Sequence, residues 1–315
     1  MSENVMGPET TVGPVVVGVD GSVVSERALL WAAEQARRTG VALRVVLVRP
    51  HPIPVTAMAT EPVWPWPVMH ARNEQDVAAA KELLTTTVES TIPNETELDI
   101  EVDVVDGPTG SSLIDAAAEA DASLIVVGRR GIGGFKRLLL GSVSEEVSTY
   151  ALCPVVVTAA DAEPSDSPVV VVGVDGSERA DVALRWAGEQ ARVTRARLHV
   201  VHTWERLYIA PDSIAGTLRS IGPDADELEA LERQVLLDVV DRARADLEGI
   251  EVTTELRDGH PGEELVKAAS DAGAQLLVVG TRGLGGFTSM MLGSVAQQSL
   301  RHATCPVAVV RPQNA

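Results

Sequence analysis

The chain repeats one pattern, and this duplication restricts its possible folds more than any other feature of the sequence. Residues 124–158 read LIVVGRRGIGGFKRLLLGSVSEEVSTYALCPVVVT, and residues 276–310 read LLVVGTRGLGGFTSMMLGSVAQQSLRHATCPVAVV. In each copy an apolar run leads into a glycine-rich loop, a helix-like segment and a second apolar run after Cys-Pro. The segment VVVGVDGS also occurs twice, at 15–22 and at 170–177. The 315 residues therefore consist of two similar units, a comfortable length for two domains.

The two units are predicted to span residues 14–158 and 169–312. Before them, residues 1–13 are polar and are expected to form a flexible N-terminus. Between them, residues 159–168 read AADAEPSDSP, and small, acidic, proline-containing stretches of this kind are typical of linkers.

Within each unit, short β-branched runs alternate with helical segments. Strands are predicted at 15–19, 43–48, 100–105, 124–127 and 155–158, and in the second unit at 169–174, 198–202, 252–256, 276–279 and 307–310. Helices are predicted at 25–40, 73–90, 111–120 and 142–151, and in the second unit through Trp186, at 226–247 and at 263–269. This rhythm predicts an α/β fold: two tandem, doubly wound units, each a parallel sheet with helices on both faces.

Charge and composition exclude several classes of partner. The net charge of −19 gives no electrostatic attraction to nucleic acid or to an anionic membrane. No apolar run reaches the ~20 residues of a membrane span, and the N-terminus has no basic-then-apolar signal, so we expect a soluble, cytoplasmic protein. Cys153 and Cys305 hold the same place in each copy, which indicates ordinary packing rather than a disulfide or a metal site.

The glycine-rich loop is the strongest functional signal. Gly128, Gly131, Gly141 and Ser142 recur with unchanged spacing as Gly280, Gly283, Gly293 and Ser294. Glycines allow the chain to approach a polyphosphate closely, and a helix that opens at Gly-Ser points backbone N–H groups towards it. The sequence therefore predicts a phosphate-binding loop in each unit.

A second signal follows the first strand of each unit, where Asp20 and Asp175 open an Asp-Gly-Ser turn. If the first and fourth strands are neighbours at the switch point of a doubly wound sheet, this turn and the loop meet in one crevice. The alternative is that the turn only caps a helix. Arg129 and Arg130 could reach phosphates, although exposed basic side chains are often merely solvated.

Both units resemble the universal stress protein family, in the branch whose Gly-x2-Gly-x9-Gly-Ser/Thr motif is associated with ATP binding. The resemblance covers about residues 14–158 and 169–311. The arrangement of the two units is similar to that of the tandem members common in actinobacteria. It implies a five-stranded parallel sheet of order 3-2-1-4-5, which places strands one and four side by side. It also implies that the last strands of the two units pair, making one chain a pseudo-dimer; a homodimer of two chains is a further possibility.

The resemblance implies ATP, with Mg²⁺, as the ligand of both units, and it identifies no metal ligand and no protein partner. The site residues that we predict in the first unit are Asp20, Val48, Gly128, Arg130, Gly131, Gly141, Ser142 and Val143. Those in the second unit are Asp175, Thr203, Gly280, Arg282, Gly283, Gly293, Ser294 and Val295. The second loop has Thr288 and Ser289 in place of Lys136 and Arg137, so we expect it to bind triphosphate more weakly.

Three functions fit these patterns. The first is an ATP-binding regulatory protein of the stress response that acts as a nucleotide-dependent switch with two sites. The second is a slow ATPase or a nucleotidyl or phosphoryl transferase, but no Walker lysine follows the loop and His51, His202 and His260 do not recur between units. We therefore predict no catalytic residue. The third, an interaction protein with inactive sites, is disfavoured by the intact motifs.

Overall fold

The structure, a computed structural model, describes residues 13–50, 74–92, 98–131, 139–159, 168–205, 225–283 and 292–312. The first unit contains β1 (Val15–Val19), α1 (Val23–Thr39), β2 (Leu43–Arg49), α2 (Glu74–Thr91), β3 (Ile100–Asp106), α3 (Thr109–Glu119), β4 (Leu124–Gly128), α4 (Ser142–Tyr150) and β5 (Val155–Thr158). The second contains β6 (Val169–Val174), α5 (Glu178–Thr194), β7 (Arg197–Trp204), α7 (Ala225–Arg242), β8 (Val252–Asp258), α8 (Pro261–Asp271), β9 (Leu276–Gly280), α9 (Ser294–His302) and β10 (Val307–Val310).

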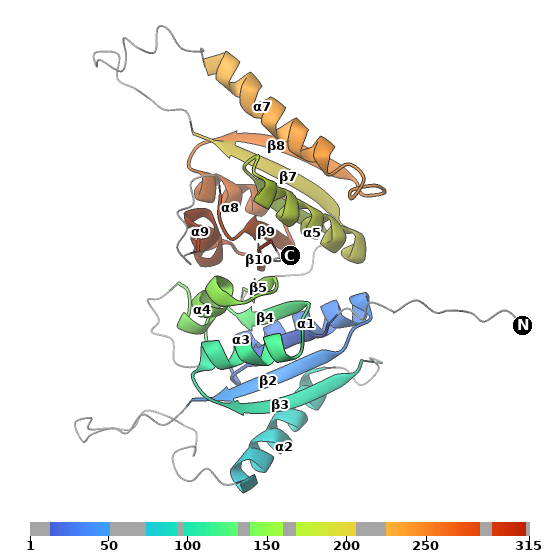
Figure 1. Cartoon of the computed structure of the whole chain (residues 1–315), viewed down its shortest axis with the longest axis vertical. Coiled ribbons are helices and arrows are strands. Elements are labelled where there is room, and N and C mark those ends of the chain that lie inside the picture. The colour runs from blue at the N-terminus through green and yellow to red at the C-terminus, as the bar shows by residue number, and fades with distance from the viewer. Residues whose placement is uncertain are drawn as a thin grey trace, which may run out of the picture.

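The strands form one ten-stranded sheet in the order β3-β2-β1-β4-β5-β10-β9-β6-β7-β8. The first unit therefore has the order 3-2-1-4-5, and the second repeats it outward from the same centre, which confirms the α/β, doubly wound prediction. Pairs within a unit are parallel, whereas β5 and β10 pair antiparallel. The two expected sheets are thus continuous. Figure 1 shows the units end to end, with β5 and β10 in the middle and α2 and α7 at the far ends.

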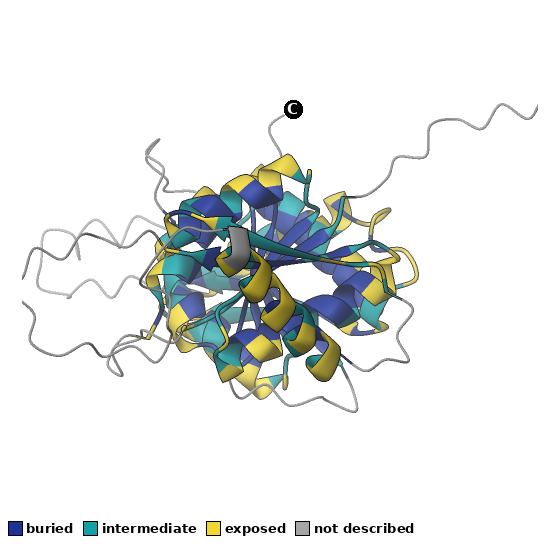
Figure 2. Cartoon of the chain, turned by 90° about the horizontal axis from the view of Figure 1, so that it is seen from below, coloured by how far each residue is buried: buried dark blue, intermediate teal, exposed yellow. Residues whose placement is uncertain are grey.

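Helices cover both faces of this sheet, because the strands are apolar on both sides. One core lies under α1, α2, α5 and α7, and the other lies under α3, α4, α8 and α9. The central strands are buried between these layers, the edge strands β3 and β8 are mostly half-buried, and the outer faces of the helices are exposed (Figure 2). Continuous valine-rich strands are what a parallel sheet with two covered faces requires.

The ends of α1 show how local sequence sets an element. Ser22 is the N-cap, and its hydroxyl oxygen accepts a hydrogen bond from the N–H of Ser25 at 3.1 Å. At the other end Gly40 has φ +70°, in the left-handed region that favours glycine, and its N–H donates to the carbonyl of Ala36. The predicted stop at Gly40 is confirmed.

The helix predicted at 226–247 is shorter in the structure, where α7 ends at Arg242. The next residues form turns, in which the N–H of Leu247 donates to the carbonyl of Ala243 at 3.1 Å. Both side chains are buried. The spacing of apolar residues predicted a longer helix because these residues are buried, but here they are buried from turns and not from a helix.

Both cysteines are free and buried, as expected for packing residues. Burial raises the pKa of the Cys153 and Cys305 thiols to about 11, so both remain neutral at physiological pH. Among the helices of the described residues, none combines the length and apolar character needed to cross a bilayer.

Candidate functional site

The turn after β1 is built around the carboxylate of Asp20. Its Oδ1 accepts a hydrogen bond from the N–H of Ser22 at 3.0 Å, and its own N–H donates to the hydroxyl of Ser25 at 3.3 Å. Gly21, between Asp20 and Ser22, has φ +81°. Because Ser22 also caps α1, the turn does have the capping role considered as the alternative.

The second unit has an equivalent turn, with the same backbone hydrogen bond to the carboxylate. Oδ1 of Asp175 accepts hydrogen bonds from the N–H of Ser177 at 3.1 Å and from its hydroxyl at 2.6 Å. Ser177 in turn accepts a hydrogen bond from the N–H of Ala180 at 3.2 Å and so caps α5. The carboxylate is therefore held in a fixed position in both units.

The glycine-rich loop meets this carboxylate. Strands β1 and β4 are paired neighbours, as are β6 and β9. A Cβ atom added to Gly131 would lie 2.2 Å from Oδ2 of Asp20, and one added to Gly283 would lie 2.7 Å from Oδ2 of Asp175. The two signals singled out in the sequence thus come together at the carboxyl ends of neighbouring strands, in both units.

The third glycine closes the loop onto its own beginning. The N–H of Gly141 donates to the carbonyl of Arg129 at 2.9 Å, and the N–H of Gly293 donates to the carbonyl of Thr281 at 2.8 Å. A Cβ on either glycine would lie 3.1 Å from that same carbonyl oxygen, so only glycine fits without a shift. We call Asp20, Gly131, Gly141 and Ser142 the first cradle. The second cradle is Asp175, Gly283, Gly293 and Ser294.

Each cradle ends at the start of a helix whose N-cap supplies no side chain. Gly141 and Gly293 are the N-caps of α4 and α9 and make no side-chain cap hydrogen bond. The first helical residues, Ser142 and Ser294, are exposed. The first N–H groups of a helix need partners and form the positive end of its dipole, so both cradles offer donors to an anion.

Sequence reasoning missed Ser144. Its hydroxyl donates to the carbonyls of Arg129 and Gly141, at 3.0 and 2.9 Å, and so ties the first loop to α4. The equivalent residue of the second unit, 152 positions on, is Ala296, which cannot make these bonds. Ser144 follows the motif by two residues. The difference between Ser144 and Ala296 in otherwise similar copies was the signal that could have found it.

The residues predicted on the second strand lie beside the carboxylates. Val19 is paired with Leu47, so Val48 is level with the residue after Val19, which is Asp20. In the second unit Val174 is paired with His202, which places Thr203 level with Asp175. Val48 is only 8% exposed, whereas Thr203 is half-buried, and little of the valine is therefore open to a ligand. Val143 and Val295, also predicted, are half-buried in the first turns of α4 and α9.

The predicted arginines have different environments. Arg130 is exposed and Arg282 is half-buried. Burial lowers the pKa of Arg311, and the positive charge of Arg282 lowers it further. Val310 is paired with Gly280, so Arg311 follows at the edge of the sheet where the second loop begins. The guanidinium of Arg129, for which the sequence left phosphate contact and solvation open, donates to the carbonyl of Ala303 in the other unit. Lys136, Arg137, Thr288 and Ser289 lie outside the described residues, so the expected difference in triphosphate affinity stays a prediction.

The first glycine of the motif has unequal surroundings in the two units, which leads to a prediction. A Cβ on Gly128 would lie 2.9 Å from Cγ1 of Val24 and 3.2 Å from its backbone carbonyl carbon. Among the described residues, one on Gly280 meets nothing closer than the carbonyl oxygen of Arg282 at 3.5 Å. We expect Gly128→Ala to lower the free energy of unfolding by about 1–3 kcal/mol through overpacking against α1. Gly280→Ala is expected to change it by less than about 0.5 kcal/mol. Urea unfolding of both variants checks this, and equal losses would contradict it.

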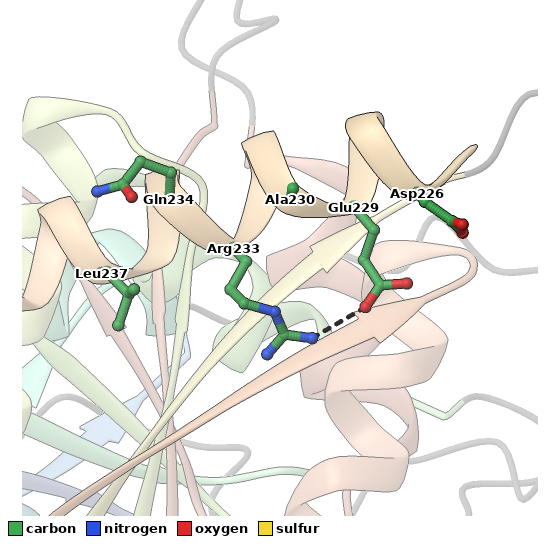
Figure 3. Close-up of a pocket in the computed structure, with 6 residues that line it drawn as sticks. All are labelled: Asp226, Glu229, Ala230, Arg233, Gln234 and Leu237. Atoms are coloured by element: carbon green, nitrogen blue, oxygen red, sulfur yellow. Dashed lines mark hydrogen bonds and ion pairs between the residues drawn. The ribbon is translucent and has the colours of Figure 1, made fainter. Parts of the chain in front are cut away.

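Two surface hollows lie along α7, away from both cradles. The smaller, of about 320 Å³, is lined by α7 among the described residues, and its Glu229 and Arg233 form an ion pair at 2.9 Å (Figure 3). The larger, of about 980 Å³, is lined by the end of α7, the turns that follow it and Val252. Neither contains a residue predicted for the site.

Comparisons with known proteins agree over nearly the whole chain. The sequence model described as "Universal stress protein family" matches residues 11–159 and again residues 168–311. A universal stress protein of Mycolicibacterium smegmatis is 32% identical over 309 residues, which cover 95% of this chain and 97% of that protein. A universal stress protein of Mycobacterium tuberculosis is 31% identical over 310 residues, covering 94% and 96%.

Solved structures show the same fold. The crystal structure of a universal stress protein from Archaeoglobus fulgidus covers 95% of this chain and 98% of its own, with a TM-score of 0.62 at 23% identity. A protein of Pseudomonas aeruginosa described as functionally unknown covers 96% and 93%, with a TM-score of 0.65 at 16% identity. Together, the doubly wound fold, the repeated glycine motif and the two family matches show that this chain belongs to the universal stress protein family, as a member with two family domains in tandem.

Proposed function

We propose that this chain is a cytoplasmic, ATP-binding regulatory protein of the stress response with two nucleotide sites, one at each cradle. One observation carries the proposal: in both units a fixed carboxylate lies against a glycine that has no room for a side chain, beside a helix start without a side-chain cap. Two such sites at the carboxyl ends of neighbouring strands are what ligand binding in a doubly wound sheet requires.

The residues of each cradle suit the two ends of ATP. The N–H groups at the start of α4 or α9, with the hydroxyl of Ser142 or Ser294, would hold phosphate oxygens. The carboxylate of Asp20 or Asp175 repels phosphate but accepts hydrogen bonds from amino and hydroxyl groups, so it suits the nucleoside end. Bound Mg²⁺ would supply positive charge that neutralises the phosphates.

A bound nucleotide can act as a switch only if it favours one state of the protein over another. We propose that the states differ in the protein partners or assembly that the chain supports. The cradle residues need perform no chemistry in this role: they bind the phosphates, orient the nucleoside and fix the ends of α4 and α9.

Calorimetric titration of the purified chain with ATP and Mg²⁺ tests the proposal. We expect binding of two ATP per chain, and nucleotide in the small molecules released from gently purified protein. Assay of the same samples for ADP and phosphate distinguishes a binding protein from an ATPase, for which turnover would be seen. No binding at millimolar ATP would overturn the proposal.

A further inference from the structure

Two arginines cross the boundary between the units, and each reaches the C-terminal end of a helix. Arg129, in the first glycine-rich loop, donates to the carbonyl of Ala303, the C-cap residue of α9. Arg311, which follows β10, donates to the carbonyls of Ser148 and Thr149 in the last turn of α4, at 3.1 and 2.8 Å. A cation at a helix C-terminus satisfies carbonyls that lack partners and interacts favourably with the helix dipole.

These contacts are crossed with respect to the cradles. Arg129 belongs to the loop of the first cradle, where its own carbonyl accepts from Gly141, yet its side chain holds the helix whose N-terminus forms the second cradle. Arg311 follows Val310, which is paired with Gly280 at the start of the second loop, and it holds the helix whose N-terminus forms the first cradle. The helices also meet directly, because Arg301 of α9 lies 3.8 Å from the carboxylate of Glu145 in α4.

The two arginines are not copies of one another. Counting 152 positions between equivalent residues, Arg129 corresponds to Thr281, and Arg311 corresponds to Ala159. Neither replacement can make the contact of its counterpart. The duplication alone therefore does not produce the crossed pair: each unit supplies its arginine from a different place in the chain.

We propose that the two cradles are coupled through this pair, so that Arg129 sets the ligand affinity of the second cradle and Arg311 sets that of the first. This inference rests on the proposed nucleotide sites and concerns their regulation. Each arginine is a positioning residue. It acts through the far end of a nine-residue helix, and it does so by stabilising the helix whose opposite end offers N–H groups to the anion.

Replacement of each arginine by its counterpart in the other unit tests the coupling in the full chain. Arg129→Thr and Arg311→Ala are titrated with ATP and Mg²⁺, and amide hydrogen exchange is followed separately in peptides from 139–150 and 292–302. Arg129→Thr should raise the ATP concentration that half-protects the second peptide by about 3- to 10-fold and leave the first within about twofold. Arg311→Ala should do the reverse. Arg129→Lys, which keeps the charge, should recover most of the loss.

Arg38→Thr is the matched control, because it also removes an arginine from the last turn of a helix, at a surface ion pair with Glu34. It should shift neither midpoint. Unchanged midpoints in both arginine variants would overturn the coupling, and so would equal weakening of both cradles, which would indicate only a looser boundary between units. If the parent chain itself shows no ATP-dependent protection, the nucleotide sites are wrong and the coupling falls with them.

Discussion

Gly131→Ala is expected to weaken binding of ATP to the first cradle by about 10- to 100-fold, leaving one strong site per chain. The reason is steric and local. The added Cβ would lie 2.2 Å from Oδ2 of Asp20, so the carboxylate must move away from the position set by Ser22. A ligand that depends on this carboxylate then loses a hydrogen bond to a charged group, which is worth about 1.5–3 kcal/mol. Calorimetric stoichiometry and affinity measure the effect.

The second unit provides a graded comparison for this prediction. In Gly283→Ala the Cβ would lie 2.7 Å from Oδ2 of Asp175, so the same loss is expected in the other cradle, and to a smaller degree. Neither glycine has a positive φ, so strain in the backbone does not confuse the result. In both variants the free energy of unfolding should change by less than the free energy of ATP binding does. Wild-type affinity in both variants would show that the carboxylates do not contact the nucleotide.

Much of the fold could be predicted from the sequence because its signals are local. The valine runs predicted strands that the structure contains, and Gly40 predicted the end of α1 because only glycine readily takes its φ of +70°. The strand order came from the family resemblance rather than from periodicity, which does not determine which strands are neighbours. The repeated motifs at 128–142 and 280–294 located both cradles. Each follows a strand that is the parallel neighbour of the first strand of its unit, and parallel neighbours end at the same edge of the sheet.

Features that depend on distant packing could not be predicted. Arg129 was considered as a residue that could reach a phosphate or be merely solvated, and no local pattern indicates that Ala303 of the other unit would be its partner. The unequal space at Gly128 and Gly280 depends on how closely α1 approaches β4, a distance that identical motifs do not encode. Sequence reasoning is therefore reliable for the backbone of the cradles and weak for the contacts that make the two units different.

Val156→Asp is expected to lower the free energy of unfolding by more than about 4 kcal/mol, the largest effect on stability that we predict. Val156 is 0% exposed and lies in β5, which is paired with β4 on one side and β10 on the other. Its partner in β10 is Ala308, also 0% exposed, and both belong to one apolar core, so an aspartate there would be buried among apolar side chains. Both units contribute to the core at this place, so we expect the whole chain, and not one unit alone, to lose stability. Urea unfolding followed by circular dichroism measures the loss.

The pH dependence of this loss identifies its cause. Burial raises the pKa of an aspartate in the folded state above its unfolded value of about 3.9, so the penalty for ionisation grows with pH between these two pKa values and disappears as the pH falls below the unfolded one. Val23→Asp is the matched control, since Val23 is 66% exposed in the first turn of α1, where a negative charge is favourable. It should change stability by less than about 0.5 kcal/mol. A mild effect of Val156→Asp, similar to that of the control, would mean that β5 and β10 are not packed together in solution.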